Sequence, residues 1–206
     1  NINIFCFGFG QVAKNLIKRL ISENYNIDLS TTSRSETNKK RFKQIDYISF
    51  KFNGDSFDPE INEKIKKSDY ILISIPPRDG TDLVFKNFST IIENSKVKWI
   101  TYLSATSVYG DHKGNWVNEN SETKSSTPNG LDRLIAEKLW MTSHLNKNLP
   151  LQIFRLSGIY SNENNILVKL KSGNVKIVNK KNHFFSRVHV EDIANILFQS
   201  LSRFKP

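Results

Sequence analysis

The stretch SATSVYG at 104–110 gathers side chains that can donate hydrogen bonds or move protons. Ser104 and Thr106 carry hydroxyls and Tyr109 carries a phenol, and they follow directly on the apolar run VKWITYL at 97–103. If that run is a buried strand, these groups stand at its carboxyl end, where parallel α/β sheets bind their ligands. We therefore take Ser104, Thr106 and Tyr109 as candidate catalytic residues, with structural packing as the competing role for Tyr109.

A second group of residues has the spacing of a phosphate-binding loop, G-x-G-x-x-A, between an apolar run at 2–7 and an amphipathic stretch at 11–24. Gly8 permits a tight turn, Gly10 lets the backbone approach a pyrophosphate, and Ala13 lets the helix pack closely on the strand. The helix N-terminus would offer free N–H groups to the phosphates. The alternative is a purely structural strand–helix turn. The pattern favours a dinucleotide-binding loop made of Gly8, Phe9, Gly10, Gln11, Val12 and Ala13.

The end of the next apolar run carries residues that discriminate between dinucleotides. The segment STTSRS at 30–35 offers Ser33 and Arg34, and no carboxylate before Glu36. A carboxylate here would bind the ribose 2′-hydroxyl of NAD, whereas an arginine with neighbouring hydroxyls suits the 2′-phosphate of NADP. We expect NADP, with NAD as the alternative, and Ser33 and Arg34 as cofactor contacts. The competing role for Arg34 is that of a solvated surface residue.

The elements that must position these residues are short apolar runs alternating with amphipathic stretches. Strands are expected at 2–7, 26–32, 47–53, 70–75, 97–103 and 151–156. Helices are expected at 11–24, 61–65, 82–94 and 131–145. Further helices are expected at 164–173 and 188–201, with a strand at 174–178 between them. This alternation predicts an α/β fold, a Rossmann-type doubly wound parallel sheet covered by helices on both faces.

Composition narrows the function classes. The chain has 206 residues, 38% of them hydrophobic, and a formal net charge of +10, but its lysines are scattered and do not interleave with aromatics, so nucleic acid is an unlikely partner. The single cysteine, Cys6, excludes a disulfide framework and fits a small buried hydrophobe. The four histidines are too dispersed for a metal site. No apolar run is long enough to cross a membrane, and the start lacks the layout of a signal peptide, so we expect a cytoplasmic protein.

Five segments in order give the chain a resemblance to the short-chain dehydrogenase/reductase superfamily, in its atypical and extended branch of NAD-dependent epimerase/dehydratases and nucleoside-diphosphate-sugar epimerases. They are GFGQVAKNL, FNGD at 52–55, SATSVYGD at 104–111, FRLSGIY at 154–160 and SRVHVEDIA at 186–194. The resemblance implies further cofactor contacts: Asp55 and Ser56 beside the adenine, Ser74, Ile75 and Pro76 along the adenosine ribose, and Ser104, Ser157, Gly158 and Ile159 toward the nicotinamide.

The resemblance also shows where the chain departs from the family pattern. The family uses a tyrosine acid/base, a lysine four residues later and a hydroxyl on the preceding strand; here those positions hold Asn129, Arg133 and Ala105. Arginine does not give up its proton near neutral pH, and asparagine is no general base. Strand alternation should point Ser104 and Thr106 away from the Ala105 face.

Substitute site residues are available nearby. Arg133 is a candidate for binding a phosphate, a ribose or an anionic substrate, with helix-face pairing as the alternative. His112, in the polar loop 111–130, is a candidate proton-transfer group or a solvated histidine. Arg187 is a candidate for contacting an anionic substrate group.

The resemblance implies a Rossmann domain at 1–160 and a partial C-terminal substrate-side segment at 161–206, a small or truncated lobe packed on the same domain. Two functions remain open. One is an NADP-dependent oxidoreductase or nucleotide-sugar epimerase/dehydratase-like enzyme, lacking the usual Tyr-x-x-x-Lys pair, that acts on a small-molecule substrate. The alternative is a non-catalytic NADP-binding regulator or assembly factor. By family likeness we also expect a homodimer through two outer helices.

Overall fold

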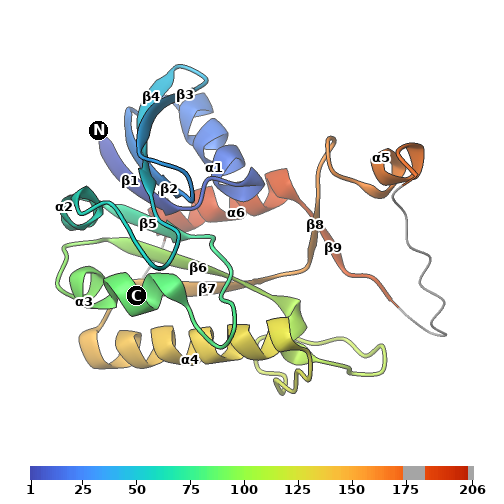
Figure 1. The fold of residues 1–206 in the computed structure, drawn as a ribbon. Helices are drawn as coiled ribbons and strands as arrows, with labels where there is room; N and C mark the ends of the chain where they lie inside the picture. The colour runs from blue at the N-terminus through green and yellow to red at the C-terminus, as the bar shows by residue number, and fades with distance from the viewer. Residues whose placement is uncertain (174–183, 204–206) are drawn as a thin grey trace.

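The central feature of the computed structural model, which describes residues 1–173 and 184–203, is a seven-stranded sheet in the order β3-β4-β2-β1-β5-β6-β7 (Figure 1). Neighbouring strands pair in parallel, except that β3 runs antiparallel to β4. The six parallel strands have the 3-2-1-4-5-6 order of a Rossmann fold, which confirms the predicted fold class. The strands are β1 (Ile2–Phe7), β2 (Ile27–Ser33), β3 (Asn38–Phe42), β4 (Ile45–Lys51), β5 (Tyr70–Ile73), β6 (Trp99–Ala105) and β7 (Leu151–Leu156).

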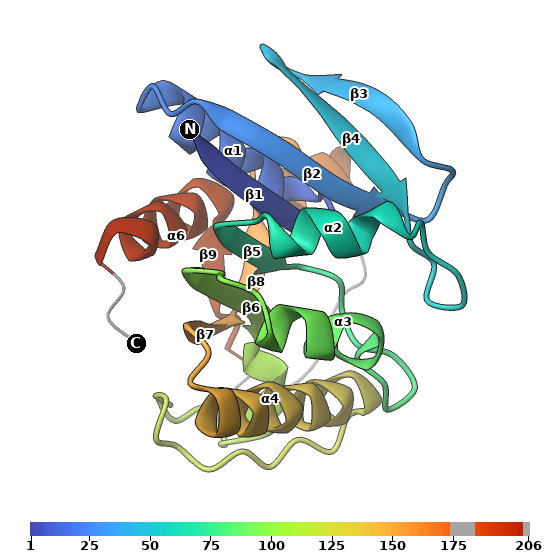
Figure 2. The same cartoon turned by 90° about the vertical axis from the view of Figure 1, so that its left-hand side faces the viewer.

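Helices cover both faces of the sheet (Figure 2). One face carries α1 (Gln11–Ser22) and α6 (Val190–Arg203); the other carries α2 (Glu60–Lys66), α3 (Leu83–Glu93) and α4 (Pro128–Lys147). Side chains of β1 alternate between the two faces of the sheet and contribute to both hydrophobic cores. Phe5 and Phe7 belong to the core under α3 and α4. Ile4 and Cys6 belong to the core under α1 and α6. Cys6 is fully buried, as expected, and burial raises the pKa of its thiol to about 12.

The side chain of Asp82 caps α3 and joins it to α4, two of the helices that cover the second face of the sheet. The Asp82 carboxylate accepts hydrogen bonds from the backbone N–H groups of Val84 (2.9 Å) and Phe85 (3.0 Å) at the start of α3. Its other oxygen accepts from Trp140 Nε1 (2.9 Å), which joins α3 to α4. Burial raises the pKa of Asp82, while these donors oppose the rise. The helix α4 begins at Pro128, earlier than the periodicity predicts, because proline is well suited to the first helical position.

The structure corrects several expectations. The helix expected at 188–201 begins at Val190, after a short strand. The strand β3 is absent from the prediction, and the strand expected at 47–53 is β4 at 45–51. The alternation expected through Thr106 is wrong because β6 ends at Ala105 and Thr106–Tyr109 form a 3₁₀ turn. The strand expected at 174–178 lies outside the described residues.

The C-terminal segment divides into a projecting arm and a packed helix. The arm consists of the parallel pair β8 (Gly158–Tyr160) and β9 (Arg187–His189) with α5 (Ile166–Lys171), and it extends from the body in Figure 1. The helix α6 instead packs beside α1, with Val190, Ile193 and Leu197 buried. No helix in 1–173 or 184–203 is long and apolar enough to cross a membrane.

Candidate cofactor site

The loop between β1 and α1 is fixed by the strands on either side of it. The backbone N–H of Gly8 donates to Thr32 Oγ1 at the end of β2 (2.9 Å), and Ser74 Oγ after β5 donates to the carbonyl of Phe7 (2.8 Å). Gly8 has φ +84°, a conformation that favours glycine, and a Cβ there would lie 2.9 Å from Ser74 Oγ. The first glycine is therefore required by the fold itself.

Gly10 is a different case. Its backbone is in the extended region (φ −83°, ψ −169°), which any residue adopts, and a Cβ built on it meets no atom within 4 Å. Neither conformation nor packing within the protein requires a glycine here. The space beside Gly10 belongs to a pocket, so the missing side chain leaves the backbone open to a ligand.

The start of α1 presents unpaired donors to the same space. Gly10 is the N-cap of α1, no side chain caps the helix, and its first turn contains no acidic residue. The first backbone N–H groups of a helix lack partners within it and carry the positive end of its dipole. An open loop and an uncapped helix start together suit a phosphate or pyrophosphate group.

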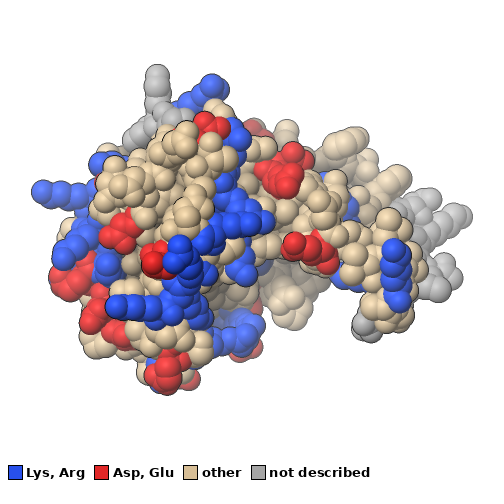
Figure 3. Space-filling model, turned by 90° about the horizontal axis from the view of Figure 1, so that it is seen from above, with Lys and Arg blue, Asp and Glu red and all other residues tan. Residues whose placement is uncertain are grey.

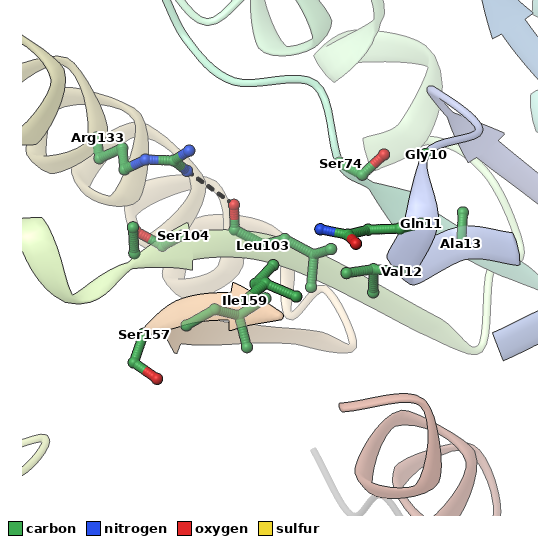
Figure 4. A pocket seen from close by; sticks show the side chains of 12 residues that line it. Gly10, Gln11, Val12, Ala13, Ser74, Leu103, Ser104, Arg133, Ser157 and Ile159 are labelled. Carbon is green, nitrogen blue, oxygen red and sulfur yellow. Dashed lines mark hydrogen bonds between the residues drawn. The ribbon is translucent and has the colours of Figure 1, made fainter. Parts of the chain in front are cut away.

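The pocket lies at the carboxyl ends of β1, β5, β6 and β7 and has a volume of about 260 Å³ (Figure 4). It brings residues 10–13 of the β1–α1 loop together with the predicted contacts Ser74, Ser104, Ser157 and Ile159, whereas the predicted contacts Gly8, Phe9 and Gly158 do not line it. Among the residues that line it Arg133 alone is charged, and its Nη1 donates to the carbonyl of Leu103 (2.9 Å). The lining consists of Gly10, Gln11, Val12, Ala13, Ser74, Leu103, Ser104, Ala105, Arg133, Leu156, Ser157 and Ile159.

The other predicted cofactor contacts lie outside the pocket lining but close to the carboxyl edge of the sheet. Ser33 ends β2, its Oγ lies 3.0 Å from Ser35 Oγ, and the exposed Arg34 follows it. Asp55 and Ser56 lie in a turn after β4, where both backbone N–H groups donate to Asn53 Oδ1 (3.1 and 2.9 Å).

Two further predicted contacts follow β5, at the same edge. A Cβ on Gly8 would lie 3.3 Å from Ile75 Cγ1, so Ile75 borders the phosphate loop; Pro76 comes next in the chain.

A buried polar network surrounds two of the catalytic candidates. Ser104 Oγ donates to Glu137 Oε1 (2.5 Å), and the Glu137 carboxylate pairs with the Arg155 guanidinium (2.8 Å). Arg155 Nη1 in turn donates to the hydroxyl of Tyr109 (3.1 Å), and its guanidinium lies over the Tyr109 ring. Hydrogen bonding to Glu137 raises the pKa of Arg155. The hydroxyl hydrogen of Ser104 is thus directed at Glu137 rather than into the pocket.

Glu137 and Arg155 are the residues that sequence reasoning missed. The signal was present: Glu137 lies three residues before Trp140 on the inward face of α4, where a carboxylate needs a partner. Arg155 lies inside the apolar strand β7, where a cation needs one too.

The remaining candidates are dispersed. Thr106 starts the 3₁₀ turn and does not line the pocket, and Asn129 is exposed in the first turn of α4. His112 Nε2 lies 3.1 Å from the carbonyl of Glu122, within the polar loop.

Arg187 on β9 pairs in register with Gly158, between the pocket residues Ser157 and Ile159. A Cβ on Gly158 would collide with its guanidinium, which lies over the ring of Phe185. In the described ranges, no three His, Cys, Asp or Glu side chains are grouped to hold a metal ion.

Comparison with known proteins agrees with this geometry at the level of fold. No family model and no curated protein matches the sequence. Solved structures do match. A conserved protein of unknown function from Silicibacter pomeroyi DSS is 29% identical, with a TM-score of 0.77, over 100% of this chain and 70% of that one.

Two similar structures are enzymes. UDP-N-acetylglucosamine 4-epimerase from Bacillus cereus is 15% identical, with a TM-score of 0.74, over 100% of this chain and 75% of that one. UDP-glucuronic acid 4-epimerase from Bacillus cereus, in complex with UDP-glucuronic acid and NAD, is 14% identical, with a TM-score of 0.77, over 98% of this chain and 74% of that one. Identities this low establish a shared fold. The chain has the Rossmann-type fold on which NAD-dependent nucleotide-sugar epimerases are built.

Proposed function

We propose that this protein binds NADP at the β1–α1 loop. The observation that carries the proposal is Gly10, a glycine that neither backbone conformation nor packing requires, beside an uncapped helix start and a pocket at the sheet's carboxyl edge. The residues fit a dinucleotide: backbone N–H groups of α1 for the pyrophosphate, and the pocket beyond them for the nicotinamide end. The similar structures with bound NAD support the same placement.

The preference for NADP over NAD rests on charge at the end of β2. Arg34 is exposed, and within the described residues no carboxylate holds it. The nearest carboxylate in sequence, Glu36, is paired with Lys51 Nζ (2.7 Å), which offsets its repulsion of a phosphate. The hydroxyls of Ser33 and Ser35 flank the guanidinium in sequence. A free cation with neighbouring hydroxyls favours a 2′-phosphate over a 2′-hydroxyl.

For the reaction we propose an NADP-dependent oxidoreductase or nucleotide-sugar epimerase/dehydratase-like activity on a small molecule. NADP, when bound, supplies hydride transfer. Arg133 lies on the pocket wall as a permanent cation, held by the Leu103 carbonyl, and it would bind a hydroxyl-rich or anionic group of the ligand. Ser157 and Ile159 would shape the wall on the β7 side.

A second candidate, a non-catalytic NADP-binding regulator or assembly factor, is favoured by one specific observation. The pocket lining contains no group that exchanges a proton near neutral pH, since its polar side chains are the Arg133 guanidinium, the Gln11 amide and the serine hydroxyls, and Ala105 stands where a hydroxyl would serve. This candidate predicts cofactor binding without turnover, and a partner whose affinity changes with the cofactor.

Calorimetric titration with NADPH and NADH, for the native protein and for Arg34→Asp, tests the binding proposal. For the native protein we expect a Kd for NADPH that is lower than the Kd for NADH by about tenfold or more. In Arg34→Asp this preference should disappear. Absence of binding by either dinucleotide would refute the proposed site. Spectrophotometric assays with carbonyl compounds and nucleotide sugars then separate the two candidate functions. Turnover by the native protein that is lost in Arg133→Met supports the enzyme. Absence of turnover by the native protein supports the regulator.

We further propose a homodimer formed through α4. Exposed apolar side chains follow one face of this helix, where a monomer would expose them to water. They are Leu131, Ile135, Leu139, Met141 and Leu145. An antiparallel arrangement of two copies about a twofold axis would place the N-terminal members of one helix against the C-terminal members of the other, so the face is complementary to itself.

A further inference from the structure

The strand β3 is the element that the six-strand Rossmann order does not require, and it carries three consecutive basic residues, Lys39, Lys40 and Arg41. In the antiparallel pair with β4, Lys40 stands opposite Tyr47 and Phe42 stands opposite Ile45. Because side chains alternate along a strand, Lys40 and Phe42 share one face of the hairpin, and Lys39 and Arg41 share the other.

The Lys40 face of the hairpin is the one turned toward the phosphate loop. The ring of Phe9, between the two loop glycines, has its centroid 5.2 Å from that of Phe42 and 5.1 Å from that of Tyr47. Directly opposed residues on antiparallel strands have Cβ atoms about 5 Å apart. Lys40 therefore neighbours an aromatic side chain that itself contacts the loop, and its four-carbon stem gives the ammonium reach toward the cofactor side.

Burial separates Lys40 from its neighbours. Arg41 is paired with Asp46 (3.6 Å), whereas within the described residues neither Lys39 nor Lys40 forms an ion pair. Of the three basic residues on β3, Lys40 is partly buried, while Lys39 and Arg41 are exposed. Figure 3 looks down on the hairpin and α1 and shows lysine and arginine gathered in a band across that face. A partly buried cation without a protein carboxylate, beside a loop suited to phosphates, calls for an anionic ligand.

We propose that Lys40 is a second cation for the adenosine 2′-phosphate of NADP, acting together with Arg34, which lies in the connection between β2 and β3. This inference rests on the proposed binding of NADP and adds a recognition residue from the edge hairpin. Lysine serves a phosphate as a point charge, and Arg34 would supply the directional hydrogen bonds. The β3–β4 hairpin would thus contact the 2′-phosphate, the group that distinguishes NADP from NAD.

Edge strands often carry lysines that prevent pairing with another chain, and Lys39 and Lys40 would share this role. Lys39 is therefore a matched control, because a general role at the sheet edge predicts the same effect for both substitutions. We would titrate the native protein, Lys40→Met and Lys39→Met with NADPH, NADH, 2′,5′-ADP and 5′-AMP. Methionine keeps an unbranched apolar stem and removes the charge. We expect Lys40→Met to weaken the binding of NADPH and 2′,5′-ADP by about tenfold and to leave the binding of NADH and 5′-AMP unchanged. Lys39→Met should leave all four within about twofold.

The outcomes separate this inference from the function on which it rests. Equal losses of NADPH affinity in Lys40→Met and Lys39→Met would overturn the role of Lys40. An equal loss of affinity for NADPH and NADH in Lys40→Met would also overturn it, since that pattern indicates a distorted loop rather than a lost phosphate contact. Normal NADPH binding by Lys40→Met, with Arg34→Asp still losing the preference, would overturn the role of Lys40 and leave the site intact. Failure of the native protein to bind any dinucleotide would refute both.

Discussion

At the scale of single residues, two glycines separated by one residue, Gly8 and Gly10, are needed for different reasons. Gly8 has a left-handed backbone and a neighbour, Ser74 Oγ, at 2.9 Å from any added Cβ. Gly10 has an ordinary backbone and free space. The G-x-G spacing assigns the tight turn to Gly8 and the open backbone to Gly10 from sequence, and the structure adds the positive φ and the close neighbour at Gly8 and the free space at Gly10.

Alanine at each position should therefore have opposite consequences. Gly8→Ala should lower the free energy of unfolding by about 1–2 kcal/mol, because an L-residue is forced into the left-handed region. Gly10→Ala should change that free energy by less than about 0.5 kcal/mol and weaken NADPH binding by about tenfold or more, because its Cβ occupies the phosphate space. Urea unfolding and calorimetry measure the two effects. Native affinity in Gly10→Ala would place the pyrophosphate elsewhere.

At the scale of elements, α4 is joined to β6 and β7 by the network of Ser104, Glu137 and Arg155. The side chain of Glu137 is 6% exposed and that of Arg155 23%, so the pair is largely removed from water. A buried pair contributes little net stability over an apolar equivalent, but removal of one partner leaves the other charge uncompensated. The network fixes the helix α4, whose preceding turn, four residues before Glu137, carries the pocket residue Arg133.

Glu137→Gln should accordingly lower the free energy of unfolding by about 3 kcal/mol, near the low end for a broken buried pair because Arg155 keeps some access to water. Lys18→Gln, at an exposed position of α1 away from this network and from the proposed dimer face, is the control and should stay within about 0.5 kcal/mol. Urea unfolding monitored by circular dichroism gives both values. Equal stabilities of the two variants would mean that the Glu137–Arg155 pair does not hold α4.

The elements also show how far sequence reasoning reaches. The parallel strands and their helices are marked by apolar runs and 3.6-residue periodicity, so the Rossmann-type fold class followed from the alternation, whereas the order of the strands came from the structure. The strand β3 has a single apolar residue, Phe42, in five, and its pairing at the sheet edge depends on β4 rather than on its own pattern. The loop residues of the pocket were predictable from motif spacing. The engagement of Ser104 with Glu137 was not, since it joins positions that are 33 residues apart.

At the scale of the whole molecule, the exposed apolar face of α4 sets what a partner copy must cover. A stable interface buries about 800 Å² per partner. A helix of 20 residues is about 30 Å long and about 10 Å across, so α4 alone presents about 300 Å². The rest has to come from the adjoining surface, where a groove beside α4 combines the apolar side chains of Phe85, Ile135 and Leu139 with polar residues. The polar residues of its lining are Glu93, Lys138, Thr142, Ser143, Asn146 and Lys147.

A charge placed in the centre of this face should separate the copies. We expect the native protein to be a dimer by size-exclusion chromatography with light scattering. Ile135→Glu should be a monomer with an unchanged circular dichroism spectrum, because association would remove the new carboxylate from water and place it among apolar side chains. Leu167→Glu, at a similarly exposed apolar position on α5, should remain a dimer. A native monomer would refute the interface, and dissociation by Leu167→Glu but not by Ile135→Glu would move it from the outer helices to the projecting arm.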